Sequence, residues 1–331
     1  MKKILVSGAG SLLGQGIIKT IKSSAKKYEI YGADYIKDSV GLYWVKKGYL
    51  LPDILKSKQN EIKWLSKIRE IIKINKINFV IPGLDFELPL FSKYKQTIEK
   101  ENKCTVVISD FKTIKIFRDK WLTSEYLKNN NFLYPYSVLP RQLKNFLKKN
   151  KFPIIIKPRN GSTSKNVFLV KNKKELNEAL KKCSNPLIQE YLYKNNNEYT
   201  CGVIFNSKEN TCLSSIVLNR QLKNGNTIKA TLKKDKKYKE IDKFIISVTK
   251  KIKPFGPLNF QLCLTKKGPI IFEINPRFSG TTPLRNLFGV NEIQIFLNSL
   301  ENQKKNKIRL KSGIIYRFYN DFYLKKEKSF L

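Results

Sequence analysis

Short apolar runs alternate with amphipathic segments over the first third of the chain. The strand-like runs cover 3–9, 28–34, 78–82 and 104–109, and the segments with helical spacing cover about 12–21, 60–75 and 87–101. Strands that alternate with helices through short loops are typical of a parallel α/β sheet. The pattern therefore predicts an α/β domain over residues 1–112.

The pattern then changes twice. A mixed segment predicts helices at 121–130, 141–150 and 173–182 and strands at 136–139, 153–157 and 167–170. From about 187 onward the expected strands are 187–190, 199–205, 212–219, 227–232, 258–264, 269–275 and 311–319, with helices at 238–252 and 291–300. Because most of these strands are joined by short polar turns, they predict an antiparallel sheet.

The composition excludes several kinds of chemistry. The 331 residues are 41% hydrophobic, which indicates a folded chain, but they include no histidine. A Ser-His-Asp or Cys-His apparatus and a histidine metal site are therefore excluded. The five cysteines are scattered and form no CxxC motif, so we expect free thiols rather than a zinc site or disulfides. Chemistry must rely on carboxylates, Lys, Arg, Asn, backbone amides or a bound metal ion.

The formal net charge is +39, but only nine of the 65 basic residues are Arg, and the lysines are spread over the whole chain. This spread is typical of solvated faces, so we expect no specific nucleic-acid partner, although the positive field would attract anionic ligands. The start, MKKILVSGAG, indicates a first strand rather than a signal peptide, and no run of 18 apolar residues occurs. We expect a cytoplasmic protein without a membrane span.

Glycines mark the turn from the first strand to the first helix. Gly8, Gly10, Gly14 and Gly16 have the spacing GxGxxxG, one residue longer than the dinucleotide fingerprint, and Asp34 stands where a ribose-binding acid would stand. A tight turn needs glycines even without a phosphate. An NAD(P)-dependent nucleotide-sugar enzyme is therefore a less favoured alternative.

Two motifs in the second half carry more specific chemistry. The run IIIKPRNGSTSKNVFLV delivers Lys157 from a buried strand into a polar loop that could wrap phosphates, or that could simply connect a hairpin. Gln261, Glu273 and Asn275 on two adjacent strands form an oxygen set suited to Mg²⁺ shared with phosphates. Arg277 follows on the same run and could reach a transferring phosphoryl group.

Taken together, IIKPRNGSTSKNV and FEINPRFSG resemble the ATP-grasp superfamily, and GAGSLLGQG and IPGLDFELP resemble the α/β domain that precedes ATP-grasp modules. The chain is most similar to the synthetase modules of carbamoyl phosphate synthase and to PylC-type amino-acid ligases. The resemblance implies a Rossmann-like pre-ATP-grasp domain over 1–112, a lid subdomain with a linking helix over 113–190, and a C-terminal subdomain with an antiparallel sheet over 191–331.

The resemblance also implies roles for individual residues. The implied ATP ligands are Lys120, Lys157, Ser162, Thr163, Glu190, Leu192, Glu198 and Lys223. The implied catalytic residues are Lys157, Arg220 and Arg277, of which Arg277 matches the arginine that steadies the acyl phosphate. The implied Mg²⁺ ligands are Gln261, Glu273 and Asn275, with Mn²⁺ as a possible substitute.

The implied reaction is ATP-dependent condensation of a small-molecule carboxylate with an amine through an acyl phosphate, with release of ADP and phosphate. Ser279, Thr281 and Arg285 are candidate substrate contacts beside the metal site, and a structural salt bridge is the alternative for Arg285. A small-molecule kinase or carboxyphosphate-forming enzyme of the same fold is the main alternative. Tailoring of a polysaccharide or small metabolite is the expected context, and a homodimer is the expected assembly if the chain is not a monomer.

Overall fold

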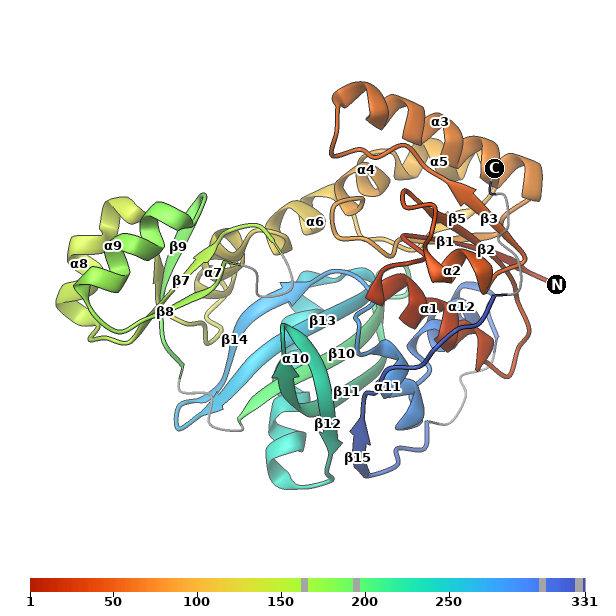
Figure 1. The fold of residues 1–331 in the computed structure, drawn as a ribbon. Coiled ribbons are helices and arrows are strands. Elements are labelled where there is room, and N and C mark those ends of the chain that lie inside the picture. The colour runs from red at the N-terminus through yellow and green to blue at the C-terminus, as the bar shows by residue number, and fades with distance from the viewer. Residues whose placement is uncertain (162–165, 193–196, 304–307, 325–329, 331) are drawn as a thin grey trace.

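The computed structural model describes residues 1–161, 166–192, 197–303, 308–324 and 330, and it contains three sheets (Figure 1). The predicted residues Ser162 and Thr163 lie outside the described residues. The three sheets fall inside the ranges 1–112, 113–190 and 191–331, which we keep as the proposed domain limits.

The first sheet is parallel, as the alternating pattern predicts, with strand order β3-β2-β1-β4-β5. Its strands are β1 (Lys3–Ser7), β2 (Glu29–Asp34), β3 (Lys47–Leu50), β4 (Phe79–Ile81) and β5 (Thr105–Val106). Its helices are α1 (Leu12–Lys22), α2 (Val40–Tyr43), α3 (Lys58–Asn75), α4 (Leu88–Lys93) and α5 (Lys95–Asn102). The short α2 and β3 had no clear signal in the sequence, and the helix predicted at 87–101 is broken at Tyr94.

Alternate residues of β1 enter two different cores. Leu5 packs with Trp64 and Ile68 of α3, whereas Ile4 and Val6 share a core with α1 and with Phe296 of the C-terminal part of the chain. Both faces of the sheet are thereby covered, which is why its strands are continuously apolar. The second of these cores fixes the α/β domain against the rest of the molecule.

The second sheet is small and antiparallel, with order β6-β9-β7-β8. It consists of β6 (Ser137–Val138), β7 (Ile154–Pro158), β8 (Phe168–Val170) and β9 (Pro186–Glu190), and its helices are α8 (Leu143–Lys149) and α9 (Lys173–Lys182). The helices α6 (Phe111–Phe117) and α7 (Lys120–Asn129) connect it to the first domain. The strand predicted at 187–190 belongs here, because it pairs with β7 rather than with the strand that follows it.

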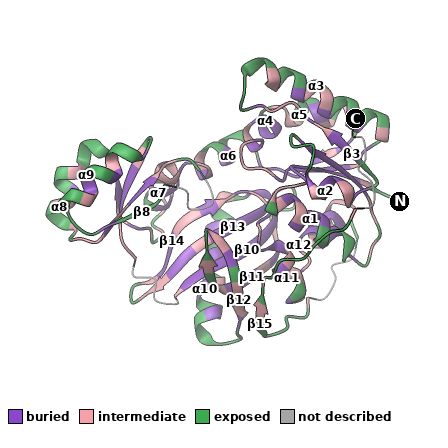
Figure 2. Ribbon diagram, in the orientation of Figure 1, coloured by how far each residue is buried: buried purple, intermediate pink, exposed green. Residues whose placement is uncertain are grey.

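The third sheet is antiparallel as predicted, with order β14-β13-β10-β11-β12-β15. Its strands are β10 (Glu198–Asn206), β11 (Thr211–Lys223), β12 (Asn226–Leu232), β13 (Phe255–Thr265), β14 (Gly268–Asn275) and β15 (Gly313–Tyr316). Its helices are α10 (Lys236–Ile252), α11 (Thr282–Leu287) and α12 (Glu292–Leu300). Figure 2 shows the buried centre of this sheet, where all nine residues of β10 are buried.

The predicted free thiols are confirmed for all five cysteines. Cys212 is half-buried and the other four are buried. None of the helices in the described ranges is long and apolar enough to cross a membrane.

Glu87, the residue immediately before α4, has a buried carboxyl group. Glu87 accepts hydrogen bonds from Ser7 Oγ at 2.6 Å and from Trp64 Nε1 at 3.2 Å. Burial, with a contribution from nearby Asp34, raises the pKa of Glu87 from about 4.5 to about 7. The folded protein therefore holds this proton more tightly than the unfolded chain does, and the free energy of unfolding should fall as the pH rises from 4.5 to 7.

We expect Glu87→Gln to remove this part of the pH dependence and to raise the free energy of unfolding at pH 8 by roughly 1–3 kcal/mol, because no charge is then buried. Urea unfolding followed by tryptophan fluorescence at pH 5 and pH 8 measures the effect. Glu61→Gln, at a partly exposed position of α3, is the control. An equal pH dependence in wild type and Glu87→Gln would contradict the assignment.

Candidate functional site

A cavity lies between the small sheet and the large sheet. The residues that line it include Lys120, Lys157, Glu190, Leu192, Glu198, Arg220, Gln261 and Glu273. These residues come from α7, from strands of both antiparallel sheets and from the connection between them, so the fold brings together side chains spread over about half of the chain. All eight were singled out in the sequence.

Lys157 enters the cavity from β7. Ile154 and Ile156 point into the core of the small subdomain, so the alternation of the strand turns Lys157 towards the cavity. The side chain is only 5% exposed, and its Nζ donates to Gln189 Oε1 at 2.8 Å. Phe272 of the large sheet lies across from it, with its ring centroid 5.7 Å from Nζ. A buried ammonium group held in this way is a fixed positive charge for an anionic ligand.

The start of α7 is tied to the polar loop that follows β7. Lys120 Nζ donates to the Gly161 carbonyl at 2.9 Å, and the Lys120 backbone N–H donates to the Arg159 carbonyl at 3.0 Å. Arg159 in turn donates to Asp119, which caps the helix. These contacts place Lys120 at the described edge of the loop that was predicted to wrap phosphates.

The connection between the two sheets forms another wall of the cavity. Glu190 accepts a hydrogen bond from the Tyr136 backbone N–H at 2.8 Å, and Tyr191 and Leu192 line the cavity beside it. On the large sheet, Arg220 donates to Glu198 Oε1 and, at 2.7 Å, to Gln261 Oε1. Arg220 and Glu198 are mostly buried and neutralise one another.

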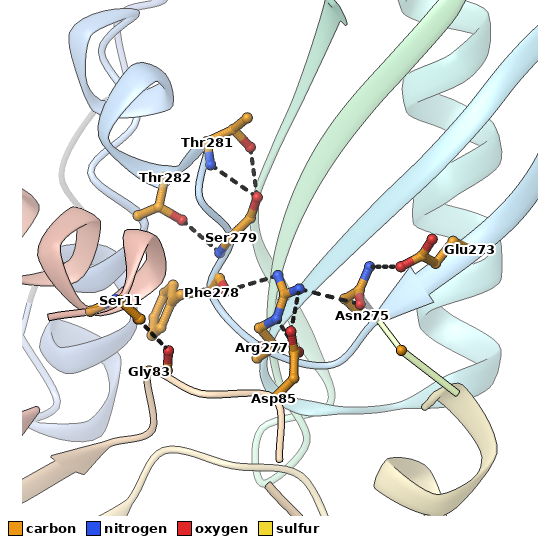
Figure 3. A network of polar contacts seen from close by, with 12 residues as sticks. Ser11, Gly83, Asp85, Glu273, Asn275, Arg277, Phe278, Ser279, Thr281 and Thr282 are labelled. Atoms are coloured by element: carbon orange, nitrogen blue, oxygen red, sulfur yellow. Dashed lines mark hydrogen bonds and ion pairs between the residues drawn. The ribbon is translucent and has the colours of Figure 1, made fainter. Parts of the chain in front are cut away.

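The proposed metal ligands are Gln261 in the middle of β13 and Glu273 and Asn275 in the last part of β14. Gln261 pairs with Glu273 in register, so their side chains lie on one face of the sheet. Asn275 Nδ2 donates to Glu273 Oε1 at 3.0 Å (Figure 3). Asn275 also accepts a hydrogen bond from Arg277 at 3.4 Å, so these polar side chains form a continuous row.

Arg277 links this row to the α/β domain. Its Nε donates to Asp85 Oδ1 at 2.7 Å and its Nη2 to Asp85 Oδ2 at 3.3 Å (Figure 3). Burial alone would raise the pKa of Asp85, but Arg277, together with Arg118 and Lys120, holds it below its ordinary value. The sequence contained the signal for Asp85 in the segment IPGLDFELP, which marks the family but does not identify the residue that meets Arg277.

Several predicted contacts lie elsewhere. Lys223 lines a different cavity, with Asn224 and Asn226, on the other side of the β11–β12 turn. Arg285 is 1% exposed and forms an ion pair with Glu292 at 2.9 Å. The structure thus contains the salt bridge that was the alternative to a substrate contact for Arg285. Ser279 and Thr281 are buried and hydrogen-bonded to each other at 2.8 Å. Arg285, Ser279 and Thr281 are thus buried and hydrogen-bonded within the protein, and their role as substrate contacts stays a prediction.

The glycine turn after β1 is filled by the protein itself. The Gly10 backbone N–H donates to the buried Asp34 carboxylate at 2.7 Å. A Cβ on Gly14 would lie 2.0 Å from the Gly8 carbonyl oxygen, and a Cβ on Gly10 would lie 2.2 Å from Ser39 Oγ. This close packing accounts for the glycines and for Asp34 without a dinucleotide, so the turn gives no support to the NAD(P) alternative.

Comparison with known proteins agrees with this geometry. Residues 117–281 match the ATP-grasp domain family. The chain is 22% identical over 328 residues to the carbamoyl phosphate synthase large chain of Pseudothermotoga lettingae. This match covers 94% of this chain and 29% of that protein. It is also 44% identical over 54 residues to the D-alanine–D-alanine ligase of Fusobacterium nucleatum subsp. nucleatum. This second match covers 16% of this chain and 18% of that protein. The chain thus spans less than a third of the length of either relative.

The fold is similar to the biotin carboxylase domain of the Hydrogenobacter thermophilus 2-oxoglutarate carboxylase, solved as a dimer with MgADP, ADP and bicarbonate. The TM-score is 0.70 at 16% sequence identity, over 95% of this chain and 73% of that chain. The predicted fold and the resemblance to the ATP-grasp superfamily are therefore confirmed.

The pair between Arg277 and Asp85 should hold the loop after β14 in place. We expect Asp85→Asn to increase amide hydrogen exchange in residues 276–282 by about tenfold, because a charge-assisted hydrogen bond contributes about 1.5–3 kcal/mol and part of it survives in the amide. Hydrogen exchange read by mass spectrometry measures this, with Asp53→Asn on the same domain as control. Unchanged exchange in this loop would show that the pair does not restrain it.

Proposed function

We propose that this chain, which contains an ATP-grasp domain over residues 117–281, is an ATP-dependent carboxylate–amine ligase that releases ADP and phosphate. The observation that carries the proposal is the cavity between the two antiparallel sheets. Its lining includes the cations Lys120 and Lys157 and the oxygen-bearing side chains Gln261 and Glu273, which supports the proposal. This is the arrangement that a nucleoside triphosphate with a divalent cation requires.

Within this cavity the adenosine moiety is assigned to the end formed by Glu190, Leu192 and Glu198, and the phosphates to the end with Lys120 and Lys157. The cavity volume is about 130 Å³, well below the ~300–1,000 Å³ of pockets that hold ligands of drug size. We therefore expect the small sheet to move away from the large sheet when a nucleotide binds. Arg220 and Lys157 already have protein partners here, and a nucleotide would exchange those partners for its own oxygens.

The oxygen-bearing side chains of Gln261 on β13 and of Glu273 and Asn275 on β14 fit Mg²⁺. The described residues contain no group of three or more Asp, Glu or Cys side chains that could hold a metal alone. Glu273 supplies one carboxylate and Gln261 and Asn275 supply amide oxygens, which suits an ion that takes its remaining ligands from phosphates and water. Bound there, Mg²⁺ would neutralise charge on the phosphates; Mn²⁺ stays a predicted substitute.

In the proposed reaction a carboxylate oxygen of the acid attacks the γ-phosphorus of ATP, and the bond to the β,γ-bridging oxygen breaks to give an acyl phosphate and ADP. The amine nitrogen then attacks the acyl carbon, phosphate leaves, and the nitrogen loses a proton to form the amide. Lys157 holds the γ-phosphoryl oxygens from its rigid strand. Arg277, oriented by Asp85, steadies the acyl phosphate. No step needs a histidine.

A kinase or carboxyphosphate-forming enzyme would use the same cavity without an amine acceptor, and it remains the second candidate. The same residues Glu273, Asn275 and Arg277 favour it, because both reactions begin with transfer of the γ-phosphoryl group. We place the ligase first because one of the curated relatives is named a ligase, at 44% identity over 54 residues. Tailoring of a polysaccharide or small metabolite, a cytoplasmic location and a homodimer stay predictions.

Binding of Mg·ATP tests the site. We expect Mg·ATP to raise the melting temperature of the wild type, and Lys157→Met or Glu273→Gln to abolish most of that shift, because each removes a charge that faces the phosphates. Lys181→Met and Glu178→Gln, exposed on α9, are the matched controls. Failure of the wild type to respond to Mg·ATP would overturn the nucleotide site.

Release of ADP separates the two candidate reactions. We expect turnover only when pools of carboxylic acids and amines are both present, and a loss of roughly 10²–10³-fold in Arg277→Met. Turnover with acids alone would instead identify a kinase-like enzyme. Coupled detection of ADP, with Arg309→Met as a control on a surface segment, is sufficient.

A further inference from the structure

A second cavity, of about 890 Å³, lies beside the nucleotide cavity. One wall is helix α1, another is the chain that follows β15, and a third is the tip of the β11–β12 hairpin. In Figure 1 the dark-blue chain after β15 runs past α1 towards α2. The volume is in the range of pockets that enclose a ligand of drug size.

Aromatic side chains around this cavity are left open to solvent. Tyr316, Phe318 and Tyr319 are 64%, 81% and 103% exposed, and Phe322 is 49% exposed with its ring 6.4 Å from that of Trp44. A folded chain rarely leaves several large apolar rings uncovered around one hollow unless something else covers them. Ring faces of this kind favour a ligand with a flat apolar body.

The charge at the cavity is positive. Lys19, Lys223 and Arg317 line it, against the single acid Asp321. Among the described residues no carboxylate forms an ion pair with any of these three cations. Arg317 is half-buried, and its guanidinium donates to the Gly280 carbonyl. An anionic group on a ligand would supply the missing counter-charge.

The second cavity shares a wall with the first. At the hairpin tip, Leu222 and Gly225 line the nucleotide cavity, whereas Lys223 and Asn224 line the second one. Leu222 and Lys223 are consecutive residues of β11 and so point to opposite faces, and in this way one hairpin borders both cavities. The Gly280 carbonyl that accepts from Arg317 lies three residues after Arg277, on the loop that leads away from the proposed phosphoryl site.

We propose that the second cavity binds the acid substrate, and that this substrate is a carboxylate carrying a planar ring. That this ligand is a substrate rests on the proposed ligase function. That the cavity binds such an anion does not depend on the ligase function. The ring packs against Trp44, Tyr319 and Phe322, and the carboxylate lies towards Lys223 and Arg317. Lys223, predicted as a nucleotide ligand, is thereby reassigned to the acid.

Calorimetric titration without ATP tests the proposal, with benzoate, indole-3-acetate and 2-naphthoate as probes. We expect saturable binding of at least one of them at one site per chain, and none of 2-naphthylmethylamine, which has the ring but the opposite charge. Tyr319→Ala and Lys223→Gln should each weaken binding at least fivefold. Tyr323→Ala and Lys266→Gln are the matched controls, because Tyr323 is 87% exposed on the same tail but does not line the cavity and Lys266 lies on another exposed turn.

The outcomes separate this proposal from the nucleotide site. Glu273→Gln should retain the aromatic acid while losing Mg·ATP, and Tyr319→Ala should retain the Mg·ATP shift. Because Tyr319 is fully exposed, its replacement removes no core packing. The proposal is overturned if no planar acid binds, if acid and amine probes bind equally, or if the cavity variants bind like the controls. It is also overturned if sedimentation shows that Tyr319→Ala instead breaks a dimer.

Discussion

The ion pair between Arg277 and Asp85 joins the two halves of the molecule at the place where the proposed chemistry occurs. Arg277 follows directly on the oxygen row of β14, and Asp85 comes from the loop after β4 of the α/β domain. A guanidinium held by both carboxylate oxygens has little freedom to turn. The packing of β1 against Phe296 brings Asp85 within reach, so the core between the domains and the geometry of the site depend on one another.

The cationic side chains Lys157 and Arg220 in the cavity have hydrogen-bond partners within the protein. Lys157 donates a hydrogen bond to Gln189, and Arg220 donates hydrogen bonds to Glu198 and Gln261. The side chains of Lys157 and Arg220 are both largely removed from water. Buried charges need partners of this kind, because an isolated buried charge is costly. The proposed nucleotide would exchange these partners for its own oxygens, and the volume of about 130 Å³ leads us to expect that the two sheets separate when it binds.

The β11–β12 hairpin connects the two cavities. Leu222 and Gly225 line the proposed nucleotide cavity, whereas Lys223 and Asn224 line the other cavity. Pro283, six residues after Arg277, lines the second cavity as well. Under the proposed function this hairpin would separate the nucleotide from the acid substrate.

The sequence by itself determined the sheet types, because alternation and short polar turns depend only on local pattern. It also singled out Lys120, Lys157, Glu190, Leu192, Glu198, Arg220, Gln261 and Glu273, which line one cavity. It did not determine which side of a hairpin Lys223 faces, whether Arg285 meets a ligand or Glu292, or which acid meets Arg277. Those outcomes depend on contacts between segments far apart in the chain, such as Asp85 with Arg277 across 192 positions. Only the packing of the domains brings such residues together, and so only the tertiary structure decided them.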